Sequence, residues 1–460
     1  MEKLGDVLKF FMEPRSVAVV GVSRKSGPDS FNLMENMLRS GFQGEVFPVN
    51  PQADMILGVK AYSRIREIHR PVDLAVITLP RDLVVPTIRE CGAAGVKAAI
   101  VVGQGFADAD AAGKRLQMQI AEIARAGGPR VLGPNTLGVV NNFNSFTTSF
   151  MPLSRDKAPI GLVCQSGLFF VGADNFTGKI GKGIDIGNAC DVGFCECLEY
   201  LGRDREVEVI AVHMEGVRHG RKFLSIAQRV ARQKPIVVFK TGESESGARA
   251  AASHSGSMAG DFVVCRTALR QAGLLFLHQG DKMGDAVRTL LHQPPLKGDR
   301  IAVITATGAG GIAASDALER YGLRLARLRP ETLRVLGALS PEWMPLGNPL
   351  DTWPSVMTHG IRETYRQTLR AVLADPEVDG VLCISLALDP DEYAFLDASG
   401  VLSDEVDPCV KKPVVAWFYG PFTNEITEKF EGIKGLSAYH TVDRAAWALS
   451  LLRERARVVE

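Results

Sequence analysis

Short apolar runs alternate with amphipathic stretches through the first third of the chain. Helix-like patterns over residues 31–38 and 83–91 separate runs that read SVAVVG, EVFPVNP, LAVITLP, AAIVVGQGF and RVLGPNTLG. Strands of a parallel sheet are buried on both faces and so are apolar along their whole length, whereas the covering helices are amphipathic. The alternation therefore predicts a doubly wound, nucleotide-binding type of α/β domain over residues 1–142.

The same alternation occurs twice more. After a link of mixed polarity at 141–159, strands are expected near 160–164, 209–214 and 236–239, with a closing helix near 286–291. Following the linker-like HQPPLKGDR, further strands are expected at IAVITATGAGG, VLCISL and PVVAWFYG. The chain is thus expected to contain two more doubly wound α/β domains, at 158–293 and 299–457.

Composition narrows the range of partners. Lys and Arg number 53 against 52 Asp and Glu, and 46% of the residues are hydrophobic. The formal charge of +1 excludes broad electrostatic attraction to nucleic acid or to acidic membranes. No signal-peptide core forms around Asp6, Lys9 and Glu13, and no apolar run approaches the roughly 18–20 residues of a membrane span, so we expect a cytoplasmic protein.

Metal binding is not predicted. Cys190, Cys195 and Cys197 form the one cysteine cluster, and C-x4-C-x-C with no histidine nearby is poor spacing for a metal site. We expect these cysteines to be structural.

The turn from Gly21 to Gly27 connects a strand to a helix, where backbone N–H groups hold phosphates. A dinucleotide fingerprint would have glycine at Ser23 and Ser26 and an acidic residue in place of Asn50. These differences favour another phosphorylated adenine nucleotide, with Arg24 and Lys25 as phosphate ligands. An NAD(P)-dependent oxidoreductase stays a weaker alternative, as does a turn that binds nothing.

The second domain carries the candidate chemistry. Ser166 and Gly167 follow a strand, where serine is expected to cap a helix, and Glu215 ends another strand, at the edge where ligands bind in doubly wound folds. A long loop of small residues is expected over 240–261, with His254 inside it. An imidazole there is suited to act as a base, as a ligand or as a nucleophile that becomes phosphorylated.

The motifs SVAVVGVS, VFPVNP, DLAVITLP, GPNTLG, CQSG, HMEG and SHSGSMAG occur in this order. Together they resemble the alpha chain of NDP-forming acyl-CoA synthetases, the superfamily of succinyl-CoA synthetase, and most of all its acetate-type, ADP-forming branch. The resemblance implies an N-terminal Rossmann-like CoA-binding domain, a flavodoxin-like domain with a phosphohistidine loop and a third, flavodoxin-like ligase domain.

The resemblance also implies roles for single residues. His254 matches the phosphorylated histidine and Glu215 the carboxylate that orients it. Phosphate contacts are implied for Ser166, Gly167, Ser253 and Gly256. CoA is expected to contact the glycine turn and neighbouring strand ends of the first domain, at Gly21, Ser23, Lys25, Asn50, Pro51, Thr78, Pro80 and Asn135.

The implied reaction converts a small carboxylic acid, CoA and ATP reversibly to acyl-CoA, ADP and phosphate, through an acyl phosphate and phosphohistidine. The chain contains no Walker motif, and in the family an ATP-grasp unit binds ATP or ADP with Mg²⁺. We therefore expect a hetero-oligomer with an ATP-grasp beta subunit. The alternative is a CoA- or acyl-CoA-binding homologue without ligase activity.

Three departures from the family pattern accompany the match. Leu168 and Phe169 stand where Ala and Leu are usual, and Thr136 stands where Cys is frequent. The bulkier pair at 168 and 169 is expected to reshape the acyl pocket.

Overall fold

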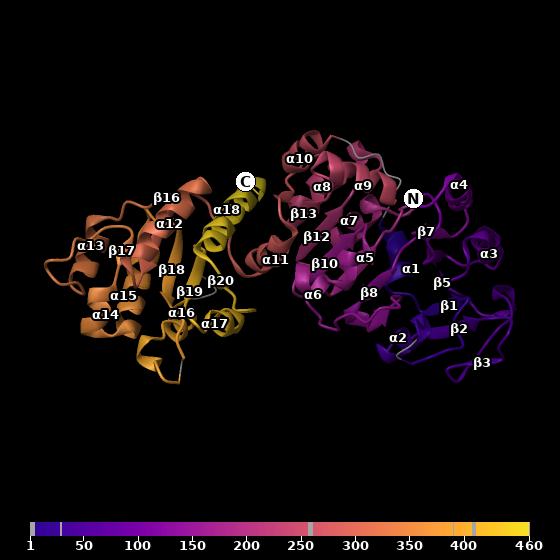
Figure 1. Cartoon of the computed structure of the whole chain (residues 1–460), viewed down its shortest axis with the longest axis horizontal. Coiled ribbons are helices and arrows are strands. Elements are labelled where there is room, and N and C mark those ends of the chain that lie inside the picture. The colour runs from indigo at the N-terminus through magenta and orange to yellow at the C-terminus, as the bar shows by residue number, and fades with distance from the viewer. Residues whose placement is uncertain (1–4, 28–29, 256–260, 390, 407–410, 460) are drawn as a thin grey trace. The chain divides into compact units, whose positions relative to one another are not determined.

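A computed structural model describes residues 5–27, 30–255, 261–389, 391–406 and 411–459, with the backbone alone described for 252–255. The chain divides into two compact units, Met1–Gly284 and Asp285–Glu460 (Figure 1). The first unit holds two large sheets and the second unit holds one.

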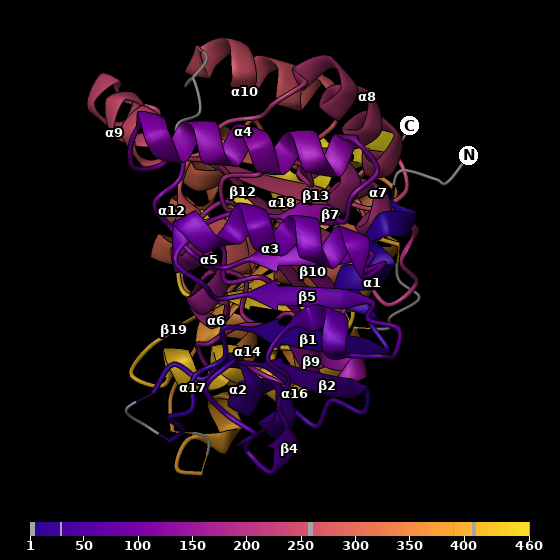
Figure 2. The same ribbon diagram turned by 90° about the vertical axis from the view of Figure 1, so that its right-hand side faces the viewer.

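The first sheet is entirely parallel, with the strand order β2-β1-β5-β6-β7. Its strands are β1 (Ser16–Val20), β2 (Glu45–Val49), β5 (Leu74–Ile77), β6 (Ala98–Val101) and β7 (Arg130–Leu132). The helices are α1 (Lys9–Met12), α2 (Leu33–Arg39), α3 (Arg81–Ala93) and α4 (Ala111–Arg125), and β3 (Met55–Ile56) with β4 (Val59–Lys60) forms a small hairpin. Figure 2 looks onto the side of this sheet where α3 and α4 lie.

The second sheet has the order β14-β13-β12-β10-β11-β8-β9. Its parallel strands are β10 (Ile160–Cys164), β11 (Lys182–Asp185), β12 (Val209–Met214), β13 (Ile236–Lys240) and β14 (Leu275–Leu277). The helices are α5 (Gly167–Val171), α6 (Ala173–Phe176), α7 (Phe194–Arg203), α8 (Gly220–Ala231), α9 (Glu245–Ser255) and α10 (Phe262–Gln271).

Two antiparallel strands, β8 (Val139–Asn141) and β9 (Phe146–Thr147), extend this sheet. They come from the end of the expected first domain and from the expected linker. Val139 and Val140 are buried against β11, so burial of this apolar pair explains why the segment joins the second sheet.

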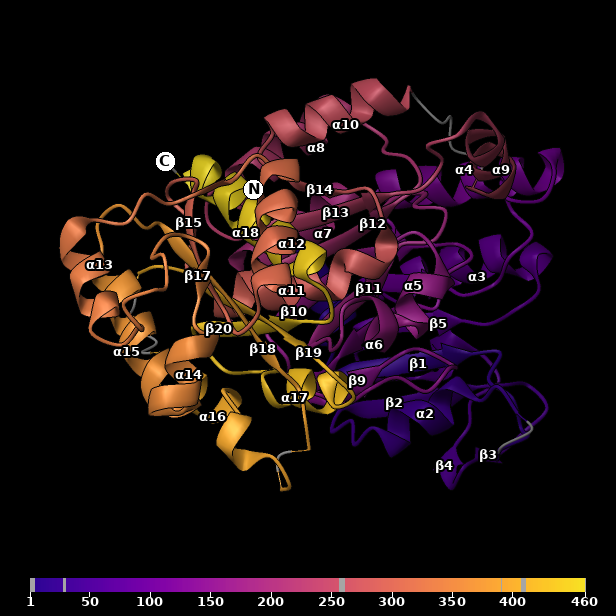
Figure 3. The same cartoon turned by 60° about the vertical axis from the view of Figure 1, so that its left-hand side comes forward.

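The third sheet has the order β16-β15-β18-β19-β20, with β17 paired to β15. Its strands are β15 (Arg300–Thr305), β16 (Arg324–Leu325), β17 (Leu350–Asp351), β18 (Gly380–Leu386), β19 (Val414–Tyr419) and β20 (Leu436–Tyr439). The helices are α12 (Gly308–Arg320), α13 (Pro330–Gly337), α14 (Trp353–His359), α15 (Ile361–Ala374), α16 (Ser399–Glu405), α17 (Thr423–Lys429) and α18 (Val442–Val459). Two apolar cores lie within this unit, one involving α12 and α18 and the other α13 to α17 (Figure 3).

Helix α11 (Met283–His292) follows the second sheet in sequence, and the expected second domain included it. Nearly all of the helix falls in the second unit. The Arg288 guanidinium donates to the carbonyl of Ala438 in β20 at 3.0 Å, and the Thr289 hydroxyl lies 2.5 Å from that of Tyr439. These side chains attach the helix to the third sheet.

All three sheets use one topology. Numbering only the parallel strands of each sheet in chain order, and leaving out β17, gives the order 2-1-3-4-5 each time. In such sheets the connections leave strands 1 and 3 in opposite directions, which opens a crevice at their carboxyl ends. This places candidate sites after β1 and β5, after β10 and β12, and after β15 and β18.

Across the described residues, no helix is both long enough and apolar enough to cross a membrane.

Candidate functional site

Gly21 occupies the crevice of the first sheet, directly after β1. Its φ is +84°, and a Cβ added there would lie 2.7 Å from the Leu79 side chain. Both the backbone conformation and the close neighbour require glycine. The backbone N–H of Gly21 also donates to Val49 at 2.9 Å, which joins the turn to the end of β2.

Two asparagines hold the glycine turn in shape. The Asn50 amide donates to the carbonyl of Val22 at 3.0 Å, and the Asn32 amide donates to those of Ser23 and Lys25 at 3.1 and 2.9 Å. Asn50 therefore bonds to the turn from the position where a dinucleotide fold has its ribose-binding carboxylate. The Lys25 side chain is exposed beside the turn, where it is accessible to a phosphate.

An apolar hollow of about 330 Å³ lies at the same edge, lined by Phe31, Leu33, Thr78, Val102 and Phe150. Phe31 is 77% exposed and meets Phe150 edge to face, with ring centroids 5.6 Å apart. The hollow thus offers aromatic surface beside a phosphate-compatible turn. Thr78 donates from its hydroxyl to Val20 at 3.1 Å, and Pro51 and Pro80 are exposed at the same edge.

Asn135 lies where the first sheet meets the second. Its φ is +60°, and its backbone N–H donates to Gly103 at 2.8 Å. Alongside this turn, the backbone N–H groups of Asn188 and Cys190 donate to Pro134 and Gly133 at 2.9 and 3.0 Å. The first domain's turn and the second domain's loop are therefore one hydrogen-bonded structure.

At the second crevice, Ser166 caps α5 as expected, accepting from the N–H of Leu168 at 3.3 Å. The neighbouring Gln165 side chain reaches across to the end of β12. Its Oε1 accepts from the backbone N–H groups of Glu215 and Gly216 at 2.7 and 3.0 Å. The structure thus brings two of the predicted phosphate-binding residues, Ser166 and Gly167, close to the backbone of Glu215.

Charged groups surround Glu215. The buried Asp185 carboxylate accepts from the N–H groups of Leu137 and Gly187, yet burial raises its pKa to about 6, and the nearby charge of Glu215 contributes to the rise. The Lys240 ammonium is buried at the end of β13 and donates to the carbonyl of Thr241 at 2.9 Å. Burial lowers the pKa of Lys240, while the charges of Cys265 and Glu215 act in the opposite direction. A cation and a second carboxyl therefore lie within electrostatic range of Glu215.

His213 lies on β12, two residues before Glu215, and is buried. It is stacked on Phe169 with ring centroids 3.8 Å apart, and its Nε2 lies 3.3 Å from the Thr241 hydroxyl. Burial, followed by the charge of Lys240, lowers the pKa of His213 to about 3. This histidine is neutral and only 1% exposed. Its ring nitrogens are therefore not accessible to a substrate.

The prediction of a loop over 240–261 is wrong for much of that range, because helix α9 spans Glu245–Ser255. The backbone of Ser253 and His254 belongs to this helix. The Ser244 hydroxyl accepts from the N–H of Gly247 at 3.0 Å and starts the helix, and the run from Ala250 to Ala252 favours its continuation. The side chains of Ser253 and His254, and all of Gly256, lie outside the described residues.

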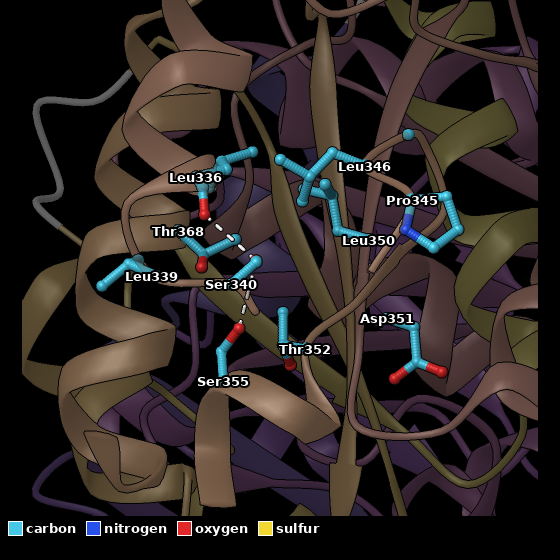
Figure 4. Close-up of a pocket in the computed structure, with 11 residues that line it drawn as sticks. Leu336, Leu339, Ser340, Pro345, Leu346, Leu350, Asp351, Thr352, Ser355 and Thr368 are labelled. Carbon is cyan, nitrogen blue, oxygen red and sulfur yellow. Dashed lines mark hydrogen bonds between the residues drawn. The ribbon is translucent and has the colours of Figure 1, made fainter. Parts of the chain in front are cut away.

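The third domain contributes a small cavity near the end of β17, where the Ser340 hydroxyl donates to Leu336 and lies 3.2 Å from that of Ser355 (Figure 4). Its volume is about 20 Å³, which is room for about one water molecule. This cavity is too small for an acid substrate.

Among the described residues, His, Cys, Asp and Glu do not gather in groups of three able to hold a metal ion.

Known protein families match the two domains that carry these residues. A family model described as a CoA binding domain matches residues 15–142, and one described as a succinyl-CoA ligase like flavodoxin domain matches residues 157–290.

The alpha subunit of ADP-forming acetate–CoA ligase II from Pyrococcus furiosus is 33% identical over 462 aligned residues, which cover 98% of this chain and 99% of that subunit. The chain belongs to the ADP-forming acetate–CoA ligase family. The family resemblance predicted from the sequence is confirmed, and with it the class of acid–CoA ligases.

Two further proteins are similar to this chain. The ADP-forming acetate–CoA ligase II of Archaeoglobus fulgidus is 38% identical over 82% of this chain, and the chain spans 56% of its length. A solved acetyl-coenzyme A synthetase 1 of Candidatus Korarchaeum cryptofilum, in complex with phosphate and ADP, is 30% identical with a TM-score of 0.85, covering 99% of this chain and 97% of that one. The predicted α/β fold class of this family is thereby confirmed.

Sequence reasoning missed three residues of the candidate site at the second crevice. Gln165 was part of the CQSG motif, but its bonds to Glu215 and Gly216 span 50 and 51 residues. Asp185 and Lys240 each end an apolar strand, and a charged residue in that position was the available signal.

Proposed function

We propose that this chain is the alpha-type subunit of an ADP-forming acid–CoA ligase that converts a carboxylic acid, CoA and ATP to acyl-CoA, ADP and phosphate. One observation carries the proposal. Gln165 joins the α5 end to the β12 end, so that Ser166, Gly167 and Glu215 form one site at the crevice of the second sheet.

In the direction of acid release, phosphate attacks the thioester carbonyl and the C–S bond breaks, which gives an acyl phosphate and free CoA. The neutral imidazole of His254 then attacks the phosphorus, and the acid leaves with the bridging oxygen. Splitting one exchange into two covalent steps lowers each barrier. The site is suited to this because Glu215 is near Lys240, an arrangement that offsets charge as the phosphoryl group moves.

Glu215 is proposed to orient His254. A carboxylate that accepts from one imidazole nitrogen fixes the tautomer and leaves the other nitrogen free to attack. The two hydrogen bonds from the Glu215 and Gly216 backbone to Gln165 hold the end of β12 in place for this role. Ser166, Gly167, Ser253 and Gly256 are proposed phosphate contacts.

CoA is proposed to lie along the crevice of the first sheet. The backbone of Gly21 allows close approach of a phosphate, Ser23 and Lys25 flank it, and the hollow beside Thr78 takes apolar groups. Asn50, Pro51 and Pro80 border the crevice, and Asn135 lies where it meets the second domain. A thioester bound this way would extend toward Glu215.

Transfer of the phosphoryl group to ADP requires a nucleotide site, which we assign to an ATP-grasp beta subunit together with Mg²⁺. The P. furiosus relative is itself named as a subunit alpha, and this chain matches it over nearly its whole length. The chain with its partner is therefore the proposed enzyme.

The test is an assay of CoA release from acetyl-CoA with phosphate and ADP. The purified chain alone should show no ADP-dependent turnover, and adding the ATP-grasp subunit should restore it. Equal turnover with and without that subunit would overturn the assignment of the nucleotide site.

A further inference from the structure

A cavity of about 670 Å³ is lined by helix α4 of the first domain and by two segments of the second, 186–196 and 216–222, which include the starts of α7 and α8. Ligand sites for small molecules have volumes of roughly 300–1,000 Å³. The cavity therefore has room for a small organic molecule, and none of the predicted phosphate or CoA contacts lines it.

The lining is strongly basic for a chain with a formal charge of +1. Its acidic residues are both matched, since Arg130 pairs with Asp191 at 2.8 Å and Lys222 lies 3.6 Å from Glu196. Three further cations in the lining have no ion pair in the described parts of the chain: Lys114, Arg125 and Arg218. Lys114, Arg125 and Arg218 are exposed, so their charges are accessible to an anion that enters the cavity.

Two of the five described residues with side chains that have a positive φ line the same cavity. Ala189 and His219 line it from different loops and have φ values of +49° and +57°. Residues with side chains rarely adopt this left-handed conformation, and such strain tends to be stored at functional sites. The Arg218 guanidinium donates to the carbonyl of Ala189 at 3.1 Å, which fastens one strained loop to the other.

The cavity reaches the ligase site through one side chain. Gln165 is part of its lining, and Oε1 of this residue accepts from the backbone N–H groups of Glu215 and Gly216. A ligand in contact with Gln165 would therefore act on the backbone that positions Glu215.

We propose that this cavity binds a small polyanion, an organic phosphate or a polycarboxylate, at a site separate from those of CoA and the phosphoryl group. The basic residues that would recognise it are Lys114, Arg125 and Arg218. The site goes beyond the proposed ligase activity and does not depend on it.

Calorimetric titration of the full chain with pyrophosphate and, separately, with citrate tests the proposal. Pyrophosphate is an inorganic probe that carries the linked phosphate groups of an organic diphosphate. Its saturable binding assigns the site to phosphate-bearing anions, and binding of citrate assigns it to polycarboxylates. The double variant Lys114→Gln with Arg125→Gln should weaken binding about tenfold, equivalent to about 1.4 kcal/mol.

Two controls separate this site from general charge effects. Lys97→Gln with Arg115→Gln removes the same charge from exposed positions outside the cavity and should leave binding within about twofold, less than about 0.4 kcal/mol. Lys25→Gln, at the glycine turn, should also retain it. The proposal is overturned if wild type binds neither probe, if both double variants weaken binding equally, or if Lys25→Gln alone abolishes it.

Discussion

The carboxylate of Asp185 accepts a hydrogen bond from the backbone N–H of Leu137 at 2.8 Å. Asp185 ends a strand of the second sheet, and Leu137 belongs to the turn that follows the last strand of the first. The Thr136 hydroxyl also donates to the backbone carbonyl of Asp185, and the N–H of Asp185 donates to Gly138 at 2.9 Å. Asp185 therefore fixes the turn after β7, which also carries Asn135, to the proposed phosphoryl-transfer domain.

Asp185 should make the stability of the protein depend on pH. Burial raises its pKa from 3.8 to about 6, so the folded state binds the proton more tightly than the unfolded chain. The stabilisation is fully present below pH 3.8 and is lost as the pH rises through about 6. A difference of about 2 in pKa corresponds to about 3 kcal/mol in the free energy of unfolding.

Asp185→Asn removes this titration and places an amide among backbone donors. We expect the variant to be less stable than wild type at both pH 4 and pH 7, with a gap about 2.4 kcal/mol wider at pH 4, where part of the unfolded chain is still ionised. Urea denaturation followed by circular dichroism measures the gap. An equal gap at both pH values, or a wider one at pH 7, would show that the Asp185 carboxyl is not held in its neutral form.

Gly21→Ala should weaken CoA binding by about tenfold or more, because the added methyl group displaces Leu79 and shifts the turn at the end of β1. Gly95→Ala is the matched control. Its φ of +78° is similar, yet no atom lies within 4 Å of the added Cβ. Both variants should lose about 1 kcal/mol of stability from the left-handed backbone. Calorimetric titration with CoA distinguishes the two variants, because only Gly21→Ala should bind CoA more weakly. Equal weakening of CoA binding in both variants would show that Gly21 is not part of the CoA site.

Gln165→Met keeps the length of the side chain but removes the acceptor for the N–H groups of Glu215 and Gly216. Formation of phosphohistidine with the ATP-grasp subunit should slow about tenfold, the effect of one lost positioning interaction of about 1.4 kcal/mol. Gln117→Met also removes an acceptor of two hydrogen bonds, from the Ala107 N–H at 3.2 Å and from the Asn188 amide at 3.0 Å, and neither donor belongs to the proposed chemistry. Thermal unfolding should report a similar loss of stability for both, whereas phosphorylation should slow in Gln165→Met alone. If both variants slow phosphohistidine formation equally, the effect of Gln165→Met comes from lost protein stability and not from the position of Glu215.

The sequence predicted the strands and most helices because each is specified locally. Apolar runs such as those from Ser16 and Ile160 are buried on both sides in the structure, and the cap formed by Ser166 is a contact within two residues. Glu215 follows the end of β12 as the apolar run before it predicted, and the end of a strand in a doubly wound sheet lies at the ligand crevice.

Other features depend on contacts that spacing does not reveal. The glycine and serine content of 240–261 favoured a loop, and the helical preference of Ala250 to Ala252 outweighed it. The partners of Gln165 and Asp185 lie 50 and 48 residues away, so their roles become visible only once the strands are placed side by side.

The most direct test of the account is to incubate the chain with an ATP-grasp beta subunit, ATP and Mg²⁺, and to map acid-labile phosphate by mass spectrometry. We predict one phosphorylated site, His254, with no label in His254→Ala and full label in His278→Ala, which alters an exposed histidine after β14. Undiminished labelling of His254→Ala, or phosphate mapped to His278, would contradict the assignment of His254 as the nucleophile.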